Sequence, residues 1–373
     1  MHFNLTDEQT MLREGAERFL EESYAFEVRH RSLQSPAGCA GDTWSAFAEM
    51  GWLALAVPEE CGGIGAGLTE LVLIAEAMGR RAVIEPYASS AVLAARLVEH
   101  CGAAILRENL LGEIAAGTLR LAFAALEQDA RYDISQPRVL ARRVAGGYVI
   151  DGRKMLVQDA PAAHKLIVLV RREESNDVAL LLVDVDAAGV TCSSYPTIDG
   201  RHAADVELRA VQVPNAAVLL AGTEAVVAVD EALDRLRLFE VADALGAMER
   251  VVELTAEHLR NRKQFGKALA GFQALQHRMA EMFVEVQEVR SALYHALANI
   301  DAGPLQRNAA VSSAKVVAIE AGRIVGGQGI QLHGGVGMTS EYQVGHYYKR
   351  LLVHERAWGD LDFHLDRMAR TYD

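Results

Sequence analysis

Apolar residues recur along this chain with two different periods, and the period changes twice. Up to residue 118 they follow helical spacing, starting behind the polar stretch 6–9, which is typical of a helix cap. Between residues 119 and 216 they form short β-type runs with no helix between them, punctuated by turn signals such as Asp151-Gly152. From residue 217 the 3.6-residue period returns over long segments.

This pattern predicts an α+β protein in which helices, then strands, then helices follow one another. We expect an N-terminal helical domain (1–118), a middle antiparallel β-barrel domain (119–216) and a C-terminal helical bundle (217–373). The expected helices include 43–50, 68–78, 89–100, 105–116, 225–262, 273–302 and 306–331. The expected strands are 121–125, 148–150, 165–170, 178–185 and 205–213.

Composition excludes several classes of protein. The 373 residues carry a formal net charge of -13, which argues against nucleic acid as a partner because a phosphate backbone needs clustered Lys and Arg. The four cysteines are scattered, so no disulfide framework or metal site is expected. No signal peptide is recognised and no apolar run reaches the roughly 18 residues of a membrane span. We therefore expect a cytoplasmic protein with no membrane insertion.

Familiar catalytic motifs are missing from the sequence. His354-Glu355 does not continue to HExxH because residue 358 is Trp, and no metal ligand set is expected. The glycines near residue 327 do not form GxGxxG after a strand, and neither GxxxxGK[ST] nor GxSxG occurs.

Two clusters in the last third could carry chemistry. Arg262, Gln264 and Phe265 stand at a helix end, followed by Phe272 and Gln273 at the start of the next helix. Arg at such a place can bind a diphosphate, although basic residues and Gly at a helix C-terminus also have a purely structural explanation.

The second cluster is Gln331 with Gly334 and Gly335. Paired glycines after a helix let a ligand approach the backbone, but they also occur in ordinary helix-ending turns.

In this order, and inside an α–β–α frame, the clusters resemble the acyl-CoA dehydrogenase family. The resemblance covers essentially the whole chain and rests on residues 51–67, 262–282 and 331–350. It implies a four-helix-bundle C-terminal domain, a tetramer, an acyl-CoA substrate, FAD at a dimer interface, and electron-transfer flavoprotein as electron acceptor. By this resemblance Arg262, Gln264 and Phe265 would meet the FAD diphosphate and adenosine, with Phe272 and Gln273 nearby. Gln331, Gly334 and Gly335 would contact the FAD of the partner subunit.

Shorter segments resemble the small subunit of pimeloyl-CoA dehydrogenase. They are residues 24–38, 121–133, 198–208 and 358–365. Related small subunits pair with a large subunit in breaking down dicarboxylic or steroid-derived CoA thioesters, which implies a homo- or hetero-tetramer with a large dehydrogenase subunit.

The expected catalytic base is not where the family places it. Most members carry a Glu before a Gly near the C-terminus, but that position here is Trp358; the position used by isovaleryl-CoA dehydrogenase is Leu236. The neighbouring Arg237 is retained and is the candidate substrate-binding residue. Glu240, one turn further along the same helix, is the candidate catalytic base; Asp243 and Asp360 are weaker alternatives.

The middle domain also departs from the family at 126–133 and 156–158, which match the stretches beside the thioester and the flavin only poorly. Two main hypotheses follow: a dehydrogenase subunit of a heteromer, or a non-catalytic subunit that completes the FAD site of a large dehydrogenase subunit. A flavoprotein performing different, oxygen-using chemistry is a third.

Overall fold

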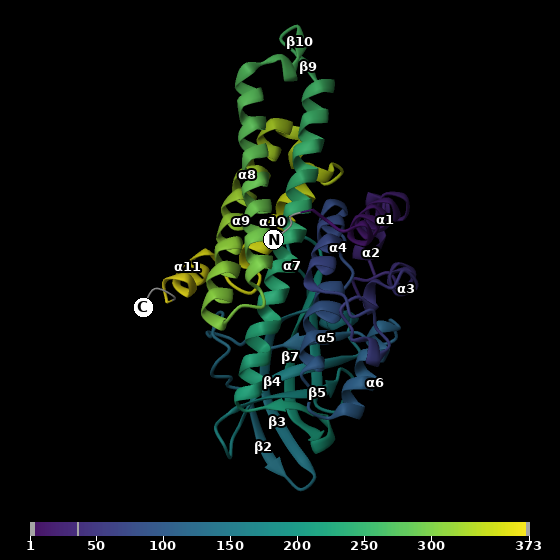
Figure 1. Ribbon diagram of the computed structural model, residues 1–373, viewed down its shortest axis with the longest axis vertical. Helices are drawn as coiled ribbons and strands as arrows, with labels where there is room; N and C mark the ends of the chain where they lie inside the picture. The colour runs from purple at the N-terminus through teal and green to yellow at the C-terminus, as the bar shows by residue number, and fades with distance from the viewer. Residues whose placement is uncertain (1–3, 36, 371–373) are drawn as a thin grey trace. The chain divides into compact units, whose positions relative to one another are not determined.

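The computed structural model describes residues 4–35 and 37–370, and these follow the predicted order of helices, strands and helices (Figure 1). They form two compact units. One takes in the described parts of 1–30, 72–83 and 237–373, and the other those of 31–71 and 84–236. Within the described residues, no helix has the length and apolarity needed to cross a bilayer.

The first helix begins at the cap that its sequence predicts. Thr6 Oγ1 accepts a hydrogen bond from the Gln9 amide at 3.1 Å, and Gln9 Oε1 accepts one from the Thr6 amide at 3.0 Å. This reciprocal pair satisfies two backbone donors that the helix leaves open. The N-terminal helices are α1 (Asp7–Ser23), α2 (Phe26–Leu33), α3 (Gly41–Glu49), α4 (Leu68–Arg81), α5 (Ala95–Glu99) and α6 (Ala104–Ala115). The expected helix 89–100 starts as a π-helical segment, η3 (Ala88–Ala94), before α5.

Eight strands form one sheet in the order β6-β7-β3-β2-β4-β5-β8, with β1 paired to β4. Their bounds are β1 (Leu121–Ala124), β2 (Leu140–Val144), β3 (Gly147–Gln158), β4 (Lys165–Arg172), β5 (Val178–Asp184), β6 (Val190–Pro196), β7 (His202–Pro214) and β8 (Val218–Ala221). Most pairs are antiparallel, as expected, but β1–β4 and β2–β4 are parallel, which alternation of side chains does not reveal. Within this unit β1 packs against the π-helical segment η3, and α5 and α6 also contact η3.

The turn signal at Asp151-Gly152 does not end a strand. β3 passes through it with a bulge between Ile150 and Gly152 in its pairing with β7. Gly152 has a φ of +143°, and a Cβ there would lie 2.8 Å from Cγ2 of Val139. Glycine is therefore required for the bulge and not for a turn.

The C-terminal helices are long and closely packed. They are α7 (Thr223–Asn261), α8 (Gln273–Asn299), α9 (Pro304–His333), α10 (Gln343–Arg356) and α11 (Leu361–Ala369). A short hairpin, β9 (Lys263–Gln264) with β10 (Lys267–Ala268), joins α7 to α8 (Figure 1). Helix α9 packs against α8, α10 and α11, and a Cβ at Gly329 would lie only 2.5 Å from Val251 of α7.

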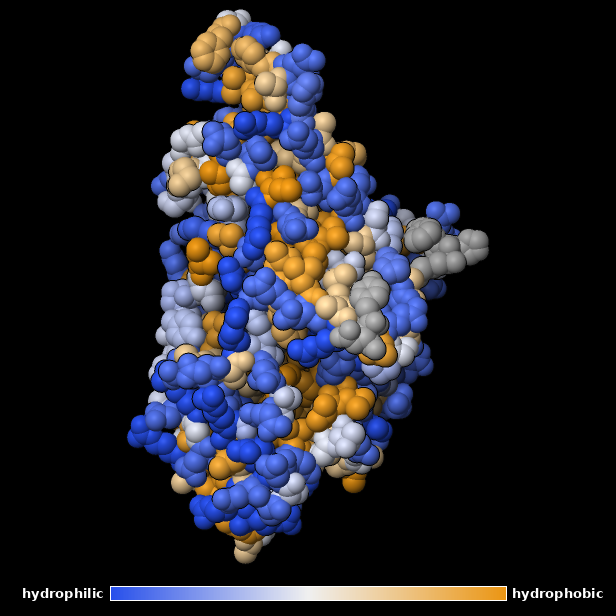
Figure 2. Space-filling model, turned by 90° about the vertical axis from the view of Figure 1, so that its left-hand side faces the viewer, coloured by the Kyte–Doolittle hydropathy of each residue, from blue (hydrophilic) through white to orange (hydrophobic). Residues whose placement is uncertain are grey.

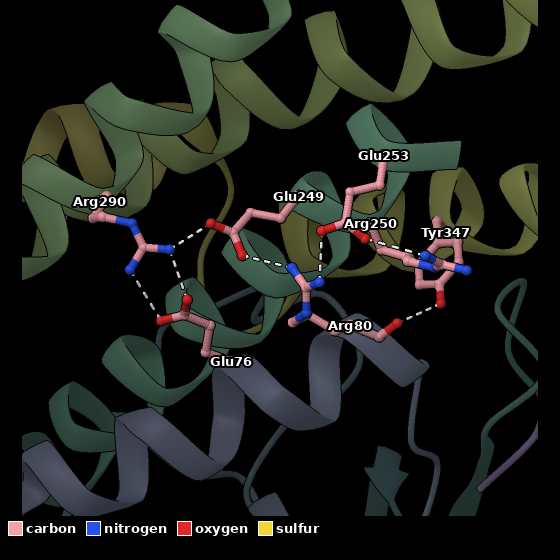
Figure 3. Close-up of polar contacts among 7 residues, drawn as sticks. All are labelled: Glu76, Arg80, Glu249, Arg250, Glu253, Arg290 and Tyr347. Atoms are coloured by element: carbon pink, nitrogen blue, oxygen red, sulfur yellow. Dashed lines mark hydrogen bonds and ion pairs between the residues drawn. The ribbon is translucent and has the colours of Figure 1, made fainter. Parts of the chain in front are cut away.

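Ion pairs fasten α4 to α7 and α8 (Figure 3). Arg290 of α8 binds Glu76 at 2.6 Å and Glu249 at 2.5 Å, and Arg80 binds the other oxygen of Glu249 at 2.9 Å. Arg80 also binds Glu253, while its backbone carbonyl accepts a hydrogen bond from the hydroxyl of Tyr347. A shared network of half-buried charges holds helices together better than isolated surface pairs do.

Candidate functional site

The first predicted cluster lies along the β9–β10 hairpin, with Arg262 directly before β9 and Phe265 in the turn between the two strands. Arg262, Gln264 and Phe265 are all exposed, and Phe265 is 88% exposed with a φ of +53°. Its ring meets that of Phe272 edge-on at 6.0 Å between centroids, and Lys267 Nζ lies 4.2 Å from the Phe272 centroid. Figure 2 shows this end of the hairpin as a knob that carries both hydrophobic and hydrophilic side chains.

The second predicted cluster follows the end of α9. Gly334 has φ +62° and ψ -140°, and its amide donates to the carbonyl of Gln331. Gln331, Gly334 and Gly335 are exposed, and a Cβ at either glycine would meet no atom within 4 Å. The backbone is therefore open to a ligand on this face.

His333, just before these glycines, is buried and fixes the turn. Its Nδ1 lies 2.8 Å from the Gly329 carbonyl and its Nε2 lies 3.2 Å from the Tyr342 hydroxyl. The His333 ring stacks on that of His258 at 4.5 Å between centroids. The open glycine turn is consequently held on a rigid support.

Both clusters fit the FAD that the family resemblance implies. An exposed guanidinium can neutralise a diphosphate, a free aromatic edge can pack against an adenine, and uncovered glycines allow contact through backbone amides. The fit rests on the donors present and on the open space around them. Each residue's contact with FAD remains a prediction.

The family's usual base position lies in the turn between α10 and α11. Trp358 is 9% exposed and has a φ of +53°, and Gly359 follows with a φ of +135°. Arg237 Nε donates to the Trp358 carbonyl oxygen at 3.0 Å. A Cβ at Gly359 would lie 2.5 Å from His364 Nε2, so this turn tolerates only glycine there.

Glu240, the candidate base, is buried and paired with a lysine that the sequence did not single out. Glu240 is 5% exposed, and its Oε2 lies 3.4 Å from Nζ of Lys315. The hollow that Glu240 lines has a volume of about 10 Å³, which holds no more than one water molecule. Glu240 thus lies in a closed part of this unit, and its role as base stays a prediction.

The alternative acids have structural contacts of their own. Asp243 accepts hydrogen bonds from Arg350 Nε at 2.7 Å and from His354 Nε2 at 2.7 Å. Burial raises the pKa of Asp243, but the Arg350 charge and hydrogen bonds outweigh it and hold that pKa far below its usual range. Asp360 caps α11 by accepting from the Phe363 amide at 3.0 Å.

The middle-domain segments 126–133 and 156–158, which match the family pattern only poorly, lie around a buried ion pair. Lys154 Nζ lies 2.6 Å from Glu127 Oε1, and the side chains are 0% and 5% exposed. Glu127 also accepts from the amides of Arg138 at 2.6 Å and Val139 at 3.1 Å. Leu156, in contrast, is 44% exposed with a φ of +49°.

Family models of the acyl-CoA dehydrogenases match the chain in three consecutive pieces. The N-terminal domain matches residues 6–118, the middle domain residues 122–211 and the C-terminal domain residues 226–372. Together they span nearly the whole chain, and the chain belongs to the acyl-CoA dehydrogenase family. It is accordingly a flavoprotein oxidoreductase of a family that binds FAD.

Individual relatives agree with this membership. The chain is 29% identical to a probable acyl-CoA dehydrogenase, YngJ, of Bacillus subtilis, over 92% of each protein. It is similar to the steroid ACAD Tcur3481-Tcur3483 in a variant form, with 28% identity, a TM-score of 0.88 and 98% of each chain covered. It is also similar to the ChsE4-ChsE5 complex of Mycobacterium tuberculosis, with 26% identity, a TM-score of 0.90, and 100% and 99% covered.

Proposed function

We propose that this chain is one subunit of a heteromeric acyl-CoA dehydrogenase, and that the carboxylate removing the α-proton belongs to its partner subunit. The observation that carries the proposal is that both positions where relatives hold a base are apolar here, at Trp358 and Leu236. Indole and isobutyl groups cannot accept a proton. Nearby acids have other contacts: Asp243 with Arg350, Asp360 at the start of α11.

The chain's own residues would bind and orient the cofactor and exclude water. Arg262 would neutralise the diphosphate at the hairpin, and Gly334 and Gly335 would let the backbone approach closely. When bound, FAD supplies the acceptor for the hydride that leaves Cβ. Trp358, held by Arg237, would form an apolar wall where a carboxylate stands in most relatives.

Similarity to two structures with paired names supports a heteromer. One is the ChsE4-ChsE5 complex, and the other is the steroid ACAD Tcur3481-Tcur3483. Together with the resemblance to pimeloyl-CoA dehydrogenase small subunits, this favours a dicarboxylyl-CoA such as pimeloyl-CoA, or a steroid-derived CoA thioester, as substrate. Electron-transfer flavoprotein is the proposed acceptor.

A second candidate function is that the chain is catalytic itself, with Glu240 as base. One observation favours it: Glu240 lies one helical turn from Arg237, and Arg237 bonds directly to Trp358 at the usual base position. In that case Lys315 would have to release Glu240 for proton transfer.

Anaerobic bleaching of the flavin by an acyl-CoA separates these candidates. The chain alone, the chain with its large subunit, and each preparation carrying Glu240→Gln would be mixed with pimeloyl-CoA or a steroid-derived CoA thioester. If the partner supplies the base, the complex bleaches, the chain alone does not, and Glu240→Gln leaves the rate constant for flavin reduction in the complex unchanged. Loss of about 10²–10⁴-fold in the complex on Glu240→Gln would reject the partner-base proposal.

A further inference from the structure

Lys315 is a buried cation in the middle of α9 whose contacts all lie on other helices or the turn after them. It is 2% exposed. Its Nζ donates to the carbonyl oxygens of His354 at 2.9 Å and Ala357 at 3.1 Å, and it lies 3.4 Å from Glu240 Oε2. An ammonium has three donors, and these three acceptors match them.

The two carbonyls that Lys315 binds belong to the end of α10. The last carbonyls of a helix lack partners within the helix and carry the negative end of its dipole, so a cation there is favourable. Ala357 is the residue directly before Trp358, whose own carbonyl receives the hydrogen bond from Arg237. Two cations from α9 and α7 therefore hold consecutive carbonyls of one turn.

The backbone of that turn adopts a strained conformation. Trp358 has a φ of +53° and Gly359 one of +135°. A non-glycine residue at positive φ costs about 1 kcal/mol or more, so it persists only where its surroundings enforce it. The Arg237 guanidinium also lies 5.5 Å from the Phe363 ring of α11. The surroundings thus include two cations, Lys315 at the Ala357 carbonyl and Arg237 at that of Trp358.

We infer that Lys315, with Glu240 as its counter-ion and Arg237 as the second donor, is a positioning residue that fixes where the side chain at position 358 lies. Glu240 then serves as the counter-ion of Lys315 and not as a base toward substrate. The side chain that these contacts position is an indole, at the place where most relatives are expected to hold the base. The identification of position 358 as the base position rests on the proposed function. The hydrogen bonds of Lys315 and Arg237 to the carbonyls of Ala357 and Trp358, which we call the clamp, are present in the free chain.

Four variants of the full-length chain test the inference: Lys315→Met, Glu240→Gln, the double variant, and Lys349→Met on the exposed face of α10 as the control. Each variant would also be made with the additional change Trp358→Phe. The difference in fluorescence between the two chains is then the signal of Trp358. The measurements are the Tm and the acrylamide quenching of the Trp358 signal, the latter far below the Tm. Lys315→Gln, which keeps two donors without charge, replaces Lys315→Met if the latter does not fold.

Removing one member of the buried pair leaves the other charge uncompensated, so we expect each single variant to lose about 5–10 °C in Tm and the double variant to recover part of that loss. Trp358 quenching should rise at least about twofold in Lys315→Met and remain raised in the double variant, because the clamp on Ala357 is lost in both. Lys349→Met should change neither quantity.

If acrylamide quenching of Trp358 changes in parallel with the Tm across the variants, and returns to the wild-type value in the double variant, the ion pair is purely structural. That result would overturn the positioning role. Tm losses that simply add in the double variant would overturn the assignment of Glu240 as counter-ion. Because the experiment needs neither substrate nor partner subunit, its failure is distinct from failure of the heteromer proposal.

Discussion

Gly79 of α4 lies so close to Asp243 of α7 that a Cβ atom would stand 1.9 Å from the Asp243 carbonyl oxygen. The same crossing repeats at Gly246, where a Cβ would lie 2.0 Å from the Glu76 carbonyl. Gly79→Ala must push the helices apart and disturb the ion pairs beside them, so we expect a loss of about 1–3 kcal/mol in the free energy of unfolding. Chemical denaturation of the purified chain measures it.

Gly15→Ala is the matched control, because Gly15 lies within α1 and a Cβ there meets nothing within 4 Å. This change should be neutral or stabilise by up to about 1 kcal/mol. Equal effects of the two substitutions would contradict the close crossing.

The hairpin arginine is predicted to bind FAD. Arg262→Ala removes a charge-assisted contact worth about 1.5–3 kcal/mol, which corresponds to at least about tenfold weaker FAD binding. Retention of flavin after dialysis, read at about 450 nm, reports the change, with the exposed Arg18→Ala of α1 as control. Equal retention by Arg262→Ala and wild type would reject the assignment.

The glycine turn after α9 offers a test that spares the fold. Gly335→Val introduces a branched side chain into open space, so the Tm should hold while flavin occupancy and oligomer assembly fall. Gly334→Val at φ +62° should additionally destabilise the chain. Full occupancy and normal assembly of Gly335→Val, by absorbance and size-exclusion chromatography, would mean that this turn is purely structural.

Position 358 is predicted to accept a carboxylate again. Because Lys315 and Arg237 hold the backbone, Trp358→Glu should place a base at the family's position and produce acyl-CoA-dependent flavin bleaching by this chain's own site. The gain over Trp358→Gln, which has the same shape but no basicity, should be about 10²–10⁴-fold. Identical bleaching by the two variants in stopped-flow measurements would contradict the prediction.

The buried pair in the middle domain gives a prediction about pH. Lys154→Met should cost about 3–5 kcal/mol at pH 7, since it leaves Glu127 charged and buried. The more exposed pair of Lys165 with Asp184 is the control, and Lys165→Met should cost no more than about 1 kcal/mol.

Burial raises the pKa of Glu127, but the Lys154 charge and the hydrogen bonds from Lys154 and from the amides of Arg138 and Val139 together outweigh burial and hold that pKa below its usual value. A lowered carboxyl pKa gives stability that is present above about pH 4.3 and is lost as pH falls through the folded-state value. The wild type should therefore lose more stability than Lys154→Met between pH 6 and pH 3, and the gap between them should narrow. A gap that stays constant in urea titrations would contradict this origin.

The periodicity of apolar residues predicts much of the fold. The strands that it does not predict form through pairing with other parts of the sequence. Helices α7, α8 and α9 are long enough to be recognised in the sequence, and their ends lie within a few residues of the expected ones. Strand β8, whose residues are apolar, was missed because it has only four residues; β2 and β6 were missed because exposed polar residues interrupt their apolar positions. Their identity depends on pairing with β3 and β7, which lie elsewhere in the sequence.

At the candidate site, short sequence patterns predicted only features that neighbouring residues form. Arg262 and the two glycines were recognised because helix ends and turns leave marks in consecutive residues. Lys315 left none: a single Lys in a long helix reads as solvent-exposed, and its acceptors lie 39, 42 and 75 positions away. The sequence does not show which carboxylates bind other side chains. Only the packing of the helices shows it.

The exposed ring of Phe265 has a consequence for assembly. The ring is 88% exposed beside that of Phe272, so the free chain keeps this aromatic surface in water. Covering it with a ligand or a second chain would remove apolar area from water, and the hydrophobic effect would then favour the assembled state over the free chain.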